Sequence, residues 1–184
     1  MDTELSPPTT IDLGDAVLRP WTVADADRLR AALAASDAHL RAWTPWVIDG
    51  RVPGATLEER LAKHADDFVT GVAWVYGMFS PDGSHGSEVV GGCGLYPRVG
   101  PHAVEVGYWV AVGHTRRGLA TRGAAALTKV ALADPRIDRV EIHCDYRNIA
   151  SARIPERLGY RLMPRAADST MLVWILSRED TSAS

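Results

Sequence analysis

The chain has 184 residues, of which 46% are hydrophobic, and its formal net charge is −3 at pH 7. This length allows one well-covered hydrophobic core but not two, so we expect a single domain over residues 1–184, with flexible ends at 1–9 and 178–184. The sequence has no long block of lysine and arginine that could neutralise many phosphates. We therefore expect no nucleic-acid partner.

The N-terminal stretch MDTELSPPTT is acidic and lacks the basic-then-apolar pattern of a signal peptide. No apolar run approaches the roughly 20 residues needed to cross a bilayer, so we expect a cytoplasmic protein without membrane association. Cys93 and Cys144 lie far apart in strand-like contexts, which favours two buried thiols over a disulfide. The six histidines lack metal-ligand spacing, so we expect no metal ion.

The first half of the chain predicts one strand, two helices and then three strands. Apolar residues recur at near-alternate positions over 11–20, as in a strand. Two helices are expected at 22–40 and 56–69, because each range opens with a capping sequence and then repeats leucine at helical spacing. The three strands, with a D-G turn signal between the first two, are expected at 72–80, 87–99 and 102–112. They should form an antiparallel meander.

The second half predicts a helix, a strand, a short helix and two closing strands. The first helix begins within RRGLATRGAAAL, and the strand RVEIHCD follows it, parallel to its predecessor. Asn148 and Gly159 are expected to cap the two ends of the short helix. The closing strands lie in YRLMP and STMLVWIL. This order indicates an α/β fold, with a mixed sheet of about seven strands flanked by about four helices.

The start of the alanine-rich helix has the features of an anion site. The first backbone N–H groups of a helix lack internal partners and carry partial positive charge. Gly118 would let a diphosphate approach the backbone, Ala120 is also small, and Arg116 and Arg117 add positive charge. An ordinary helix start with two surface arginines remains the alternative.

Two common phosphate-binding loops do not fit this stretch. A Walker A loop would need lysine and a hydroxyl at Leu119 and Ala120, and a dinucleotide loop would need glycine at Thr115. The stretch instead resembles the acyl-CoA loop of the GNAT superfamily of N-acetyltransferases, Q/R-x-x-G-x-G/A. Gly118 and Ala120 match that pattern, and Thr115 departs from it.

A second motif strengthens the resemblance. Residues Asn148, Ser151, Leu158, Gly159 and Tyr160 match the family pattern N-x-x-S-x-x-x-x-x-x-L-G-F/Y. The stretch VEVGYWVAVGHTRRGLAT is similar to the RimJ/RimL-like branch, which acetylates ribosomal-protein N-termini, and so is the tryptophan-rich stretch LRAWTPWV. In all, the resemblance covers about residues 10 to 177.

The resemblance implies a GNAT fold whose sheet splits between its fourth and fifth strands, with acetyl-CoA as cosubstrate. In such a fold the loop would hold the CoA pyrophosphate. The strand end before it would hydrogen-bond pantetheine and polarise the thioester carbonyl, because a splitting sheet leaves backbone groups without ladder partners. The implied CoA contacts are Val110, Ala111, Val112, Arg116, Arg117, Gly118, Leu119, Ala120, Thr121 and Asn148.

The resemblance also implies candidate catalytic residues. Many family members protonate the CoA sulfur with a tyrosine seven residues after the motif asparagine, but Pro155 stands there. Ser151 matches the serine that the RimJ/RimL-like branch is thought to use instead, and its alternative is a helix serine bonded to its own backbone. Glu105 is the candidate base, acting through water, and its alternative is a strand-face ion pair. Asn148 could cap its helix as well as contact CoA.

The acceptor is expected to be an easily deprotonated amine. An α-amino group with a pKa near 7.7–8.0 is roughly a tenth neutral at pH 7, whereas a lysine near 10.4 is neutral only about once in 2,500 molecules. Trp43 and Trp46 either line the acceptor pocket or pack beneath the helices. His143 and Cys144 point to opposite faces of one strand, so we interpret them as a surface histidine and a core cysteine.

These features predict direct transfer of an acetyl group from acetyl-CoA to an amine, without an acyl-enzyme. The leading acceptor is a protein or peptide N-terminus, such as that of a ribosomal protein. A small amine, for example an aminoglycoside, is the alternative within enzymes, and a non-catalytic acyl-CoA sensor is the alternative outside them. An exposed terminal strand would allow a homodimer.

Overall fold

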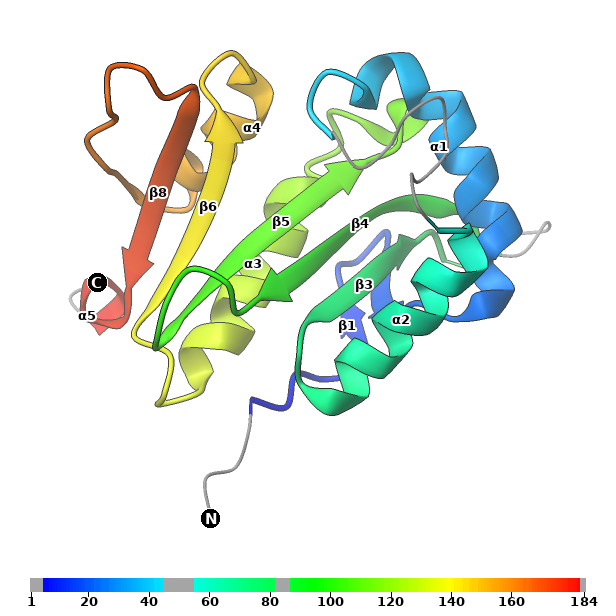
Figure 1. The fold of residues 1–184 in the computed structure, drawn as a ribbon, viewed down its shortest axis with the longest axis horizontal. Coiled ribbons are helices and arrows are strands. Elements are labelled where there is room, and N and C mark those ends of the chain that lie inside the picture. The colour runs from blue at the N-terminus through cyan, green and yellow to red at the C-terminus, as the bar shows by residue number, and fades with distance from the viewer. Residues whose placement is uncertain (1–4, 45–54, 82–86, 183–184) are drawn as a thin grey trace.

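The computed structural model describes residues 5–44, 55–81 and 87–182. Over these ranges eight strands form one sheet in the order β1-β2-β3-β4-β5-β6-β8-β7 (Figure 1). The strands are β1 Ile11–Asp12, β2 Val17–Pro20, β3 Trp74–Phe79, β4 Val89–Tyr96, β5 Ala103–Val110, β6 Arg139–Asp145, β7 Arg161–Leu162 and β8 Met171–Ser177. The α-helices are α1 Ala26–Leu40, α2 Leu57–Thr70, α3 Leu119–Ala133, α4 Ile149–Arg157 and α5 Arg178–Ser182. Two short 3-10 turns, Val23–Asp25 and Val112–His114, precede α1 and follow β5.

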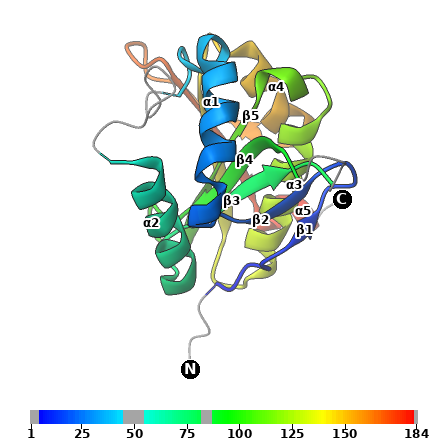
Figure 2. The same cartoon turned by 90° about the vertical axis from the view of Figure 1, so that its right-hand side faces the viewer.

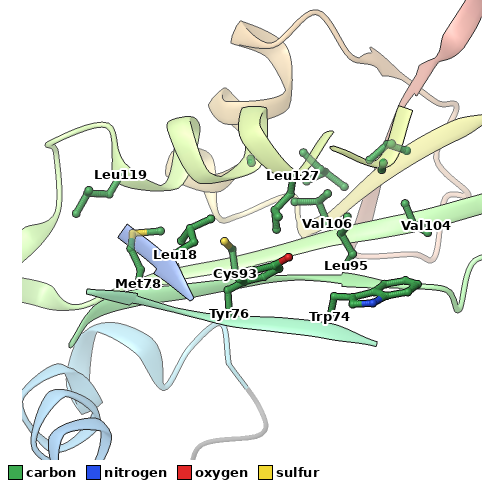
Figure 3. Close-up of a cluster of buried hydrophobic side chains, with 14 of the residues drawn as sticks. Leu18, Trp74, Tyr76, Met78, Cys93, Leu95, Val104, Val106, Leu119 and Leu127 are labelled. Atoms are coloured by element: carbon green, nitrogen blue, oxygen red, sulfur yellow. The ribbon is translucent and has the colours of Figure 1, made fainter. Parts of the chain in front are cut away.

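Helices cover both faces of the sheet (Figure 2). On one face, α1 and α2 bury leucines such as Leu33 and Leu61 against Val75 and Phe79. On the other face, α3 packs its apolar side on the centre of the sheet, and Figure 3 shows Leu119 and Leu127 of this helix above the strands. The result is a three-layer molecule with a core on each side of the sheet.

The predicted order of elements is confirmed. β3, β4 and β5 form the expected antiparallel meander, although the D-G turn at residues 82–83 lies outside the described residues. β6 runs parallel to β5, as expected. The local caps also form: Thr56 Oγ1 accepts the Glu59 N–H at 3.1 Å while the Glu59 carboxylate accepts the Thr56 N–H at 2.8 Å. Both cysteines are buried and unbridged.

The first strand prediction is wrong in one respect. The range 11–20 is not one strand but a hairpin of β1 and β2, in which Ile11 pairs with Leu18. Gly14 makes the turn possible with a φ of +89°, and its N–H donates to Asp12 Oδ1 at 2.7 Å. This extra strand brings the sheet to eight strands, and its split falls between the fifth and sixth.

Two residues near the ends of the described chain bond to distant elements. Residues 178–182 form α5, and the Arg178 guanidinium donates to the carbonyls of Leu132 and Ile137 at 2.7 and 2.6 Å. Near the other end, the Tyr76 hydroxyl donates to the Pro8 carbonyl at 2.8 Å. Pro8 and Arg178 are thus each held against the body of the domain.

Candidate active site

The central feature of the site is a split in the sheet between β5 and β6. Their parallel register runs from Ala103 with Arg139 to Glu105 with Glu141 and stops there, whereas β5 stays paired with β4 up to Val110. Figure 1 shows the two strands separating beyond this point, towards the end of the sheet that carries α4. A ligand could therefore enter the sheet between the two strands.

The backbone of β5 offers hydrogen-bonding groups to this split. The Ala111 N–H donates to the Val90 carbonyl of β4 at 2.9 Å. Because donors and acceptors alternate sides along an antiparallel strand, the backbone groups of Tyr108 and Val110 point the other way, towards β6. Their register partners on β6 are missing from the ladder. The expected pantetheine contact at Val110 is consistent with this arrangement.

Ala111 and Val112 lie beside Val110, but their backbone groups already have partners. The Val112 N–H donates to the Oγ of buried Ser36 at 3.0 Å, and its carbonyl accepts the Thr115 hydroxyl at 3.1 Å. The Ala111 carbonyl accepts the His114 N–H at 2.9 Å. A CoA contact through these two residues would require those bonds to be shared or exchanged.

The loop that the sequence predicts as a pyrophosphate site leads directly into α3. Gly118 is the residue before the helix and has a φ of +74°, and Arg116 has the unusual φ of +62°. Leu119 is buried and anchors the helix in the core, while Ala120 and Thr121 form its first turn. The loop therefore presents the helix N-terminus to the outside and not to the core.

An acidic residue organises the arginines of this loop. Asp15, in the β1–β2 turn, accepts a hydrogen bond from Arg117 at 2.9 Å and also pairs with Arg122 of α3. Arg122 additionally donates to the Arg117 carbonyl at 2.8 Å. Two cations are thus held side by side at the helix N-terminus, which suits a dianionic ligand.

Ser151 lies at the split, and the structure brings a tyrosine to it. The Tyr108 hydroxyl of β5 is 3.2 Å from Ser151 Oγ and donates to the Ser151 carbonyl at 3.2 Å. Burial raises the pKa of the Tyr108 phenol, so it keeps its proton at neutral pH. Asn148 Oδ1 accepts the Ser151 N–H at 3.1 Å, so Asn148 does cap α4.

Pro155 explains why the Ser151 carbonyl is available. In an α-helix the N–H of residue 155 would bond to the carbonyl of residue 151, but proline has no N–H. Pro155 lies inside α4 and is buried. The carbonyl left without its helical partner accepts the Tyr108 hydroxyl instead, which holds the phenol next to Ser151 Oγ.

Glu105 lies on the other face of the sheet, within a row of charges. Both of its oxygens accept hydrogen bonds from Arg98 at 2.8 Å. His143 Nδ1 is 4.0 Å from Glu105 Oε2, and His143 Nε2 is 2.7 Å from Glu141 Oε2. Glu105 therefore forms the strand-face ion pair that was predicted as the alternative to a role as base. To act as base, it would have to accept a proton while paired with Arg98.

A cavity of about 200 Å³ lies between α2 and the β4–β5 pair. Its floor includes Gly92 and Gly107, where aromatic rings cover the backbone: a Cβ at Gly107 would come within 3.2 Å of the Tyr96 ring. The polar side chains at its wall are Arg60, His64 and Arg98. This cavity lies on the face of the sheet opposite α3.

The two predicted tryptophans do not define this cavity. Trp43 follows α1, is 38% exposed and is absent from the cavity lining, while Trp46 lies outside the described residues. Trp21 and Trp109 line the cavity instead. No role for Tyr108 was predicted from the sequence, because its contact with Ser151 joins residues 43 positions apart.

The described part of the chain has neither a membrane-spanning helix nor a metal-binding cluster. None of its helices combines the length and the apolar character needed to span a membrane. The same residues contain no group of three or more histidine, cysteine, aspartate or glutamate side chains arranged to hold a metal ion.

Comparison with known proteins gives a match to the family model described as an acetyltransferase (GNAT) domain, over residues 15–161. A relative in Bacillus subtilis (strain 168), the uncharacterised N-acetyltransferase YjdG, is 26% identical over 89 residues, or 48% of this chain. The match spans only 53% of the length of that relative.

Solved structures with the same fold include ribosomal-protein acetyltransferases. The ribosomal-protein-S5-alanine acetyltransferase from Vibrio fischeri superposes with a TM-score of 0.78 and 16% identity, covering 94% of this chain and 98% of that chain. The ribosomal L7/L12 α-N-protein acetyltransferase RimL, in complex with coenzyme A, gives a TM-score of 0.76 and 17% identity over 93% of this chain and 99% of that chain. At these identities the likeness concerns the fold.

Proposed function

The chain belongs to the GNAT acetyltransferase family, and on that premise we propose that it transfers the acetyl group of acetyl-CoA to a primary amine, by direct attack and without an acyl-enzyme. The observation that carries this proposal is the split between β5 and β6, with Ser151 and Tyr108 on one side of the sheet and an open cavity on the other. Such a split lets the thioester meet an amine that arrives from the opposite face.

Acetyl-CoA would bind with its pyrophosphate at the N-terminus of α3. There the backbone N–H groups after Gly118 and the paired cations Arg117 and Arg122 meet the anion. Pantetheine would lie along β5, where the Val110 backbone faces the split. This path directs the thioester towards the Ser151 hydroxyl.

The reaction requires a proton donor for the sulfur. The amine nitrogen attacks the carbonyl carbon, the carbon–sulfur bond breaks, and the thiolate takes a proton. We assign this proton to the Ser151 hydroxyl. Tyr108 Oη is 3.2 Å from Ser151 Oγ, and once the serine has lost its proton the phenol O–H can turn from the Ser151 carbonyl to Oγ and replace that proton.

The proposed acceptor is the α-amine of a protein or peptide. The ribosomal-protein acetyltransferases among the similar folds support this choice, as does the small fraction of a lysine amine that is neutral at pH 7. A small amine would give the same chemistry. A non-catalytic acyl-CoA sensor would bind CoA but show no turnover.

Ser151→Ala is expected to reduce kcat at least about tenfold, because the thiolate then leaves without a positioned proton. Thiol release from acetyl-CoA should be measured with peptide N-termini, aminoglycosides, polyamines and amino acids, for wild type and variant. The dissociation constant of CoA should change less than about threefold, since the substitution removes only one hydroxyl.

A matched control is Ser177→Ala at the far end of β8, next to Arg139 rather than the split. It should retain wild-type turnover. Tyr108→Phe removes only the supporting hydroxyl and is expected to have a smaller effect than Ser151→Ala. Wild-type turnover in Ser151→Ala would show that another group protonates the sulfur, and CoA binding without turnover of any acceptor would favour the sensor.

A further inference from the structure

The charges on the α2 side of the split form a chain of contacts that the proposed reaction has not used. Glu105 and Glu141 are register partners on β5 and β6, so two carboxylates lie next to each other on this face. Arg98 neutralises Glu105, and the Arg139 Nε donates to Glu141 Oε1 at 2.8 Å. His143 joins the two halves, since it contacts Glu141 and faces Glu105.

The ring of His143 has a defined orientation. Its Nε2 is 2.7 Å from Glu141 Oε2, and a carboxylate at that distance places the ring proton on Nε2. The lone pair then lies on Nδ1, which is 4.0 Å from Glu105 Oε2. Two acceptors face each other across a gap too long for a hydrogen bond, so a single donor with two protons could contact both.

The gap and the cavity are neighbours along β5. The residue beyond Glu105 on the same face of β5 is Gly107, which has no side chain and lines the cavity. His143 stands at the corresponding level of β6, where the two strands have separated, and a quarter of its side chain is exposed. Gly107 thus adds no side chain of its own between the cavity and Nδ1, and the Tyr96 ring lies over its backbone.

Glu105 alone is a poorly placed base. Each of its oxygens already accepts a hydrogen bond from Arg98, so the carboxylate is held in an ion pair. It can still hold a cation through its remaining lone pairs. His143 offers the group that Glu105 lacks, an unshared ring nitrogen next to the split.

We propose that His143 Nδ1 is the proton acceptor of the reaction, and that Glu105 Oε2 holds the same substrate ammonium; this rests on the acetyl transfer proposed above. The ammonium N–H bond breaks, its proton moves to Nδ1, and the neutral amine attacks the thioester. Glu141 and Glu105 stabilise the resulting imidazolium until it releases the proton to water. Of the three ammonium protons, one moves to His143 and then to water, and one stays on the amide nitrogen. The third leaves the nitrogen as the amide forms and makes up for the proton that the sulfur takes.

The charged groups around His143 come from three segments. Glu141 and Arg139 lie on β6, Glu105 lies on β5, and Arg98 follows β4. On the other side, β8 places Val173 opposite His143. The immediate partners of the ring are thus two carboxylates, each paired with an arginine.

The test is His143→Asn, assayed with acetyl-CoA and the peptide that wild type acetylates best, from pH 6.5 to 9.5. At pH 7 the kcat/KM for the peptide should fall about 20-fold. The deficit should shrink to less than about threefold at pH 9.5, where an α-amine is already neutral and needs no base. The dissociation constant of CoA should stay within about twofold of the wild-type value.

His102→Asn is the matched control, because His102 lies at the far end of the meander and asparagine tolerates its positive φ of 56°. It should leave the pH profile unchanged. His143→Gln is a second variant in case asparagine disturbs the strand.

Four outcomes would overturn the inference. An equal loss at every pH would mean a structural role for His143, and an unchanged rate would mean no role. If high pH restored the kcat/KM of Glu105→Gln but not that of His143→Asn, Glu105 would be the base. Absence of turnover by wild type with every acceptor would instead defeat the proposed acetyl transfer, and the inference with it.

Discussion

Gly118→Val should weaken CoA binding about 100-fold, equivalent to roughly 2.7 kcal/mol. Gly118 precedes α3 with a φ of +74°, where a residue with a Cβ is disfavoured by roughly 1–2 kcal/mol, and a β-branched one by more. Without ligand, the loop of the variant can leave this conformation. CoA binding requires the conformation again, so the strain reduces the affinity for CoA. The valine side chain would also hold the pyrophosphate away from the helix N-terminus and crowd the Arg122 guanidinium, which lies 3.2 Å from an added Cβ.

Gly113→Val is the control for this experiment. Gly113 lies five residues earlier, has no positive φ, and a Cβ there would meet nothing within 4 Å. Its variant should bind CoA as wild type does in a calorimetric titration. If Gly118→Val bound CoA within about threefold of wild type, the pyrophosphate would have to lie elsewhere.

Local features of the fold could be predicted because they depend on neighbours in sequence. The Thr56–Glu59 box and the Asn148 cap each need only a side chain and a backbone N–H three residues apart. The hairpin at 11–20 was missed because its turn rests on the single Gly14, and its strands are too short for an alternation pattern to show a break.

The candidate site was predictable only in part. The motif identified Ser151, but no sequence pattern connects it to Tyr108, which is 43 positions earlier and meets it only after the sheet has formed. From the sequence, Pro155 only excluded a tyrosine at its position. Because proline has no N–H, the Ser151 carbonyl lacks its helical partner. The structure shows that this carbonyl accepts the Tyr108 hydroxyl instead.

The same limit applies to the base. Glu105 was assigned as the base by the family resemblance, and its pairing with Arg98 depends on how the loop after β4 folds back. His143 was interpreted as a surface residue because alternation places it opposite the core cysteine, and that placement is correct. Alternation along one strand could not show that β5 separates from β6 beside His143 and leaves its ring next to the split.

His64 should make the stability of the domain fall as the pH falls from 6.5 towards 4. Burial, and then the positive charge of Arg60, lowers the pKa of this imidazole from 6.5 to about 4. Between these two values the unfolded chain binds a proton that the folded chain does not, so acidification favours unfolding. A shift of this size corresponds to about 3 kcal/mol, fully lost once the pH reaches the folded-state value.

The measurement is the free energy of unfolding by urea between pH 4 and pH 8, for wild type and for His64→Leu. The leucine variant cannot titrate, and it also removes a buried Nδ1 that has no hydrogen-bond partner among the described residues. Carboxylates with lowered pKa values, such as those of Asp25 and Asp145, are common to both proteins and cancel in the difference. The wild-type minus variant curve should therefore be flat above pH 6.5 and fall below it. A difference that stays constant over the whole range would mean that His64 is protonated as readily in the folded chain as in the unfolded one, and that the cavity beneath α2 admits water to the ring.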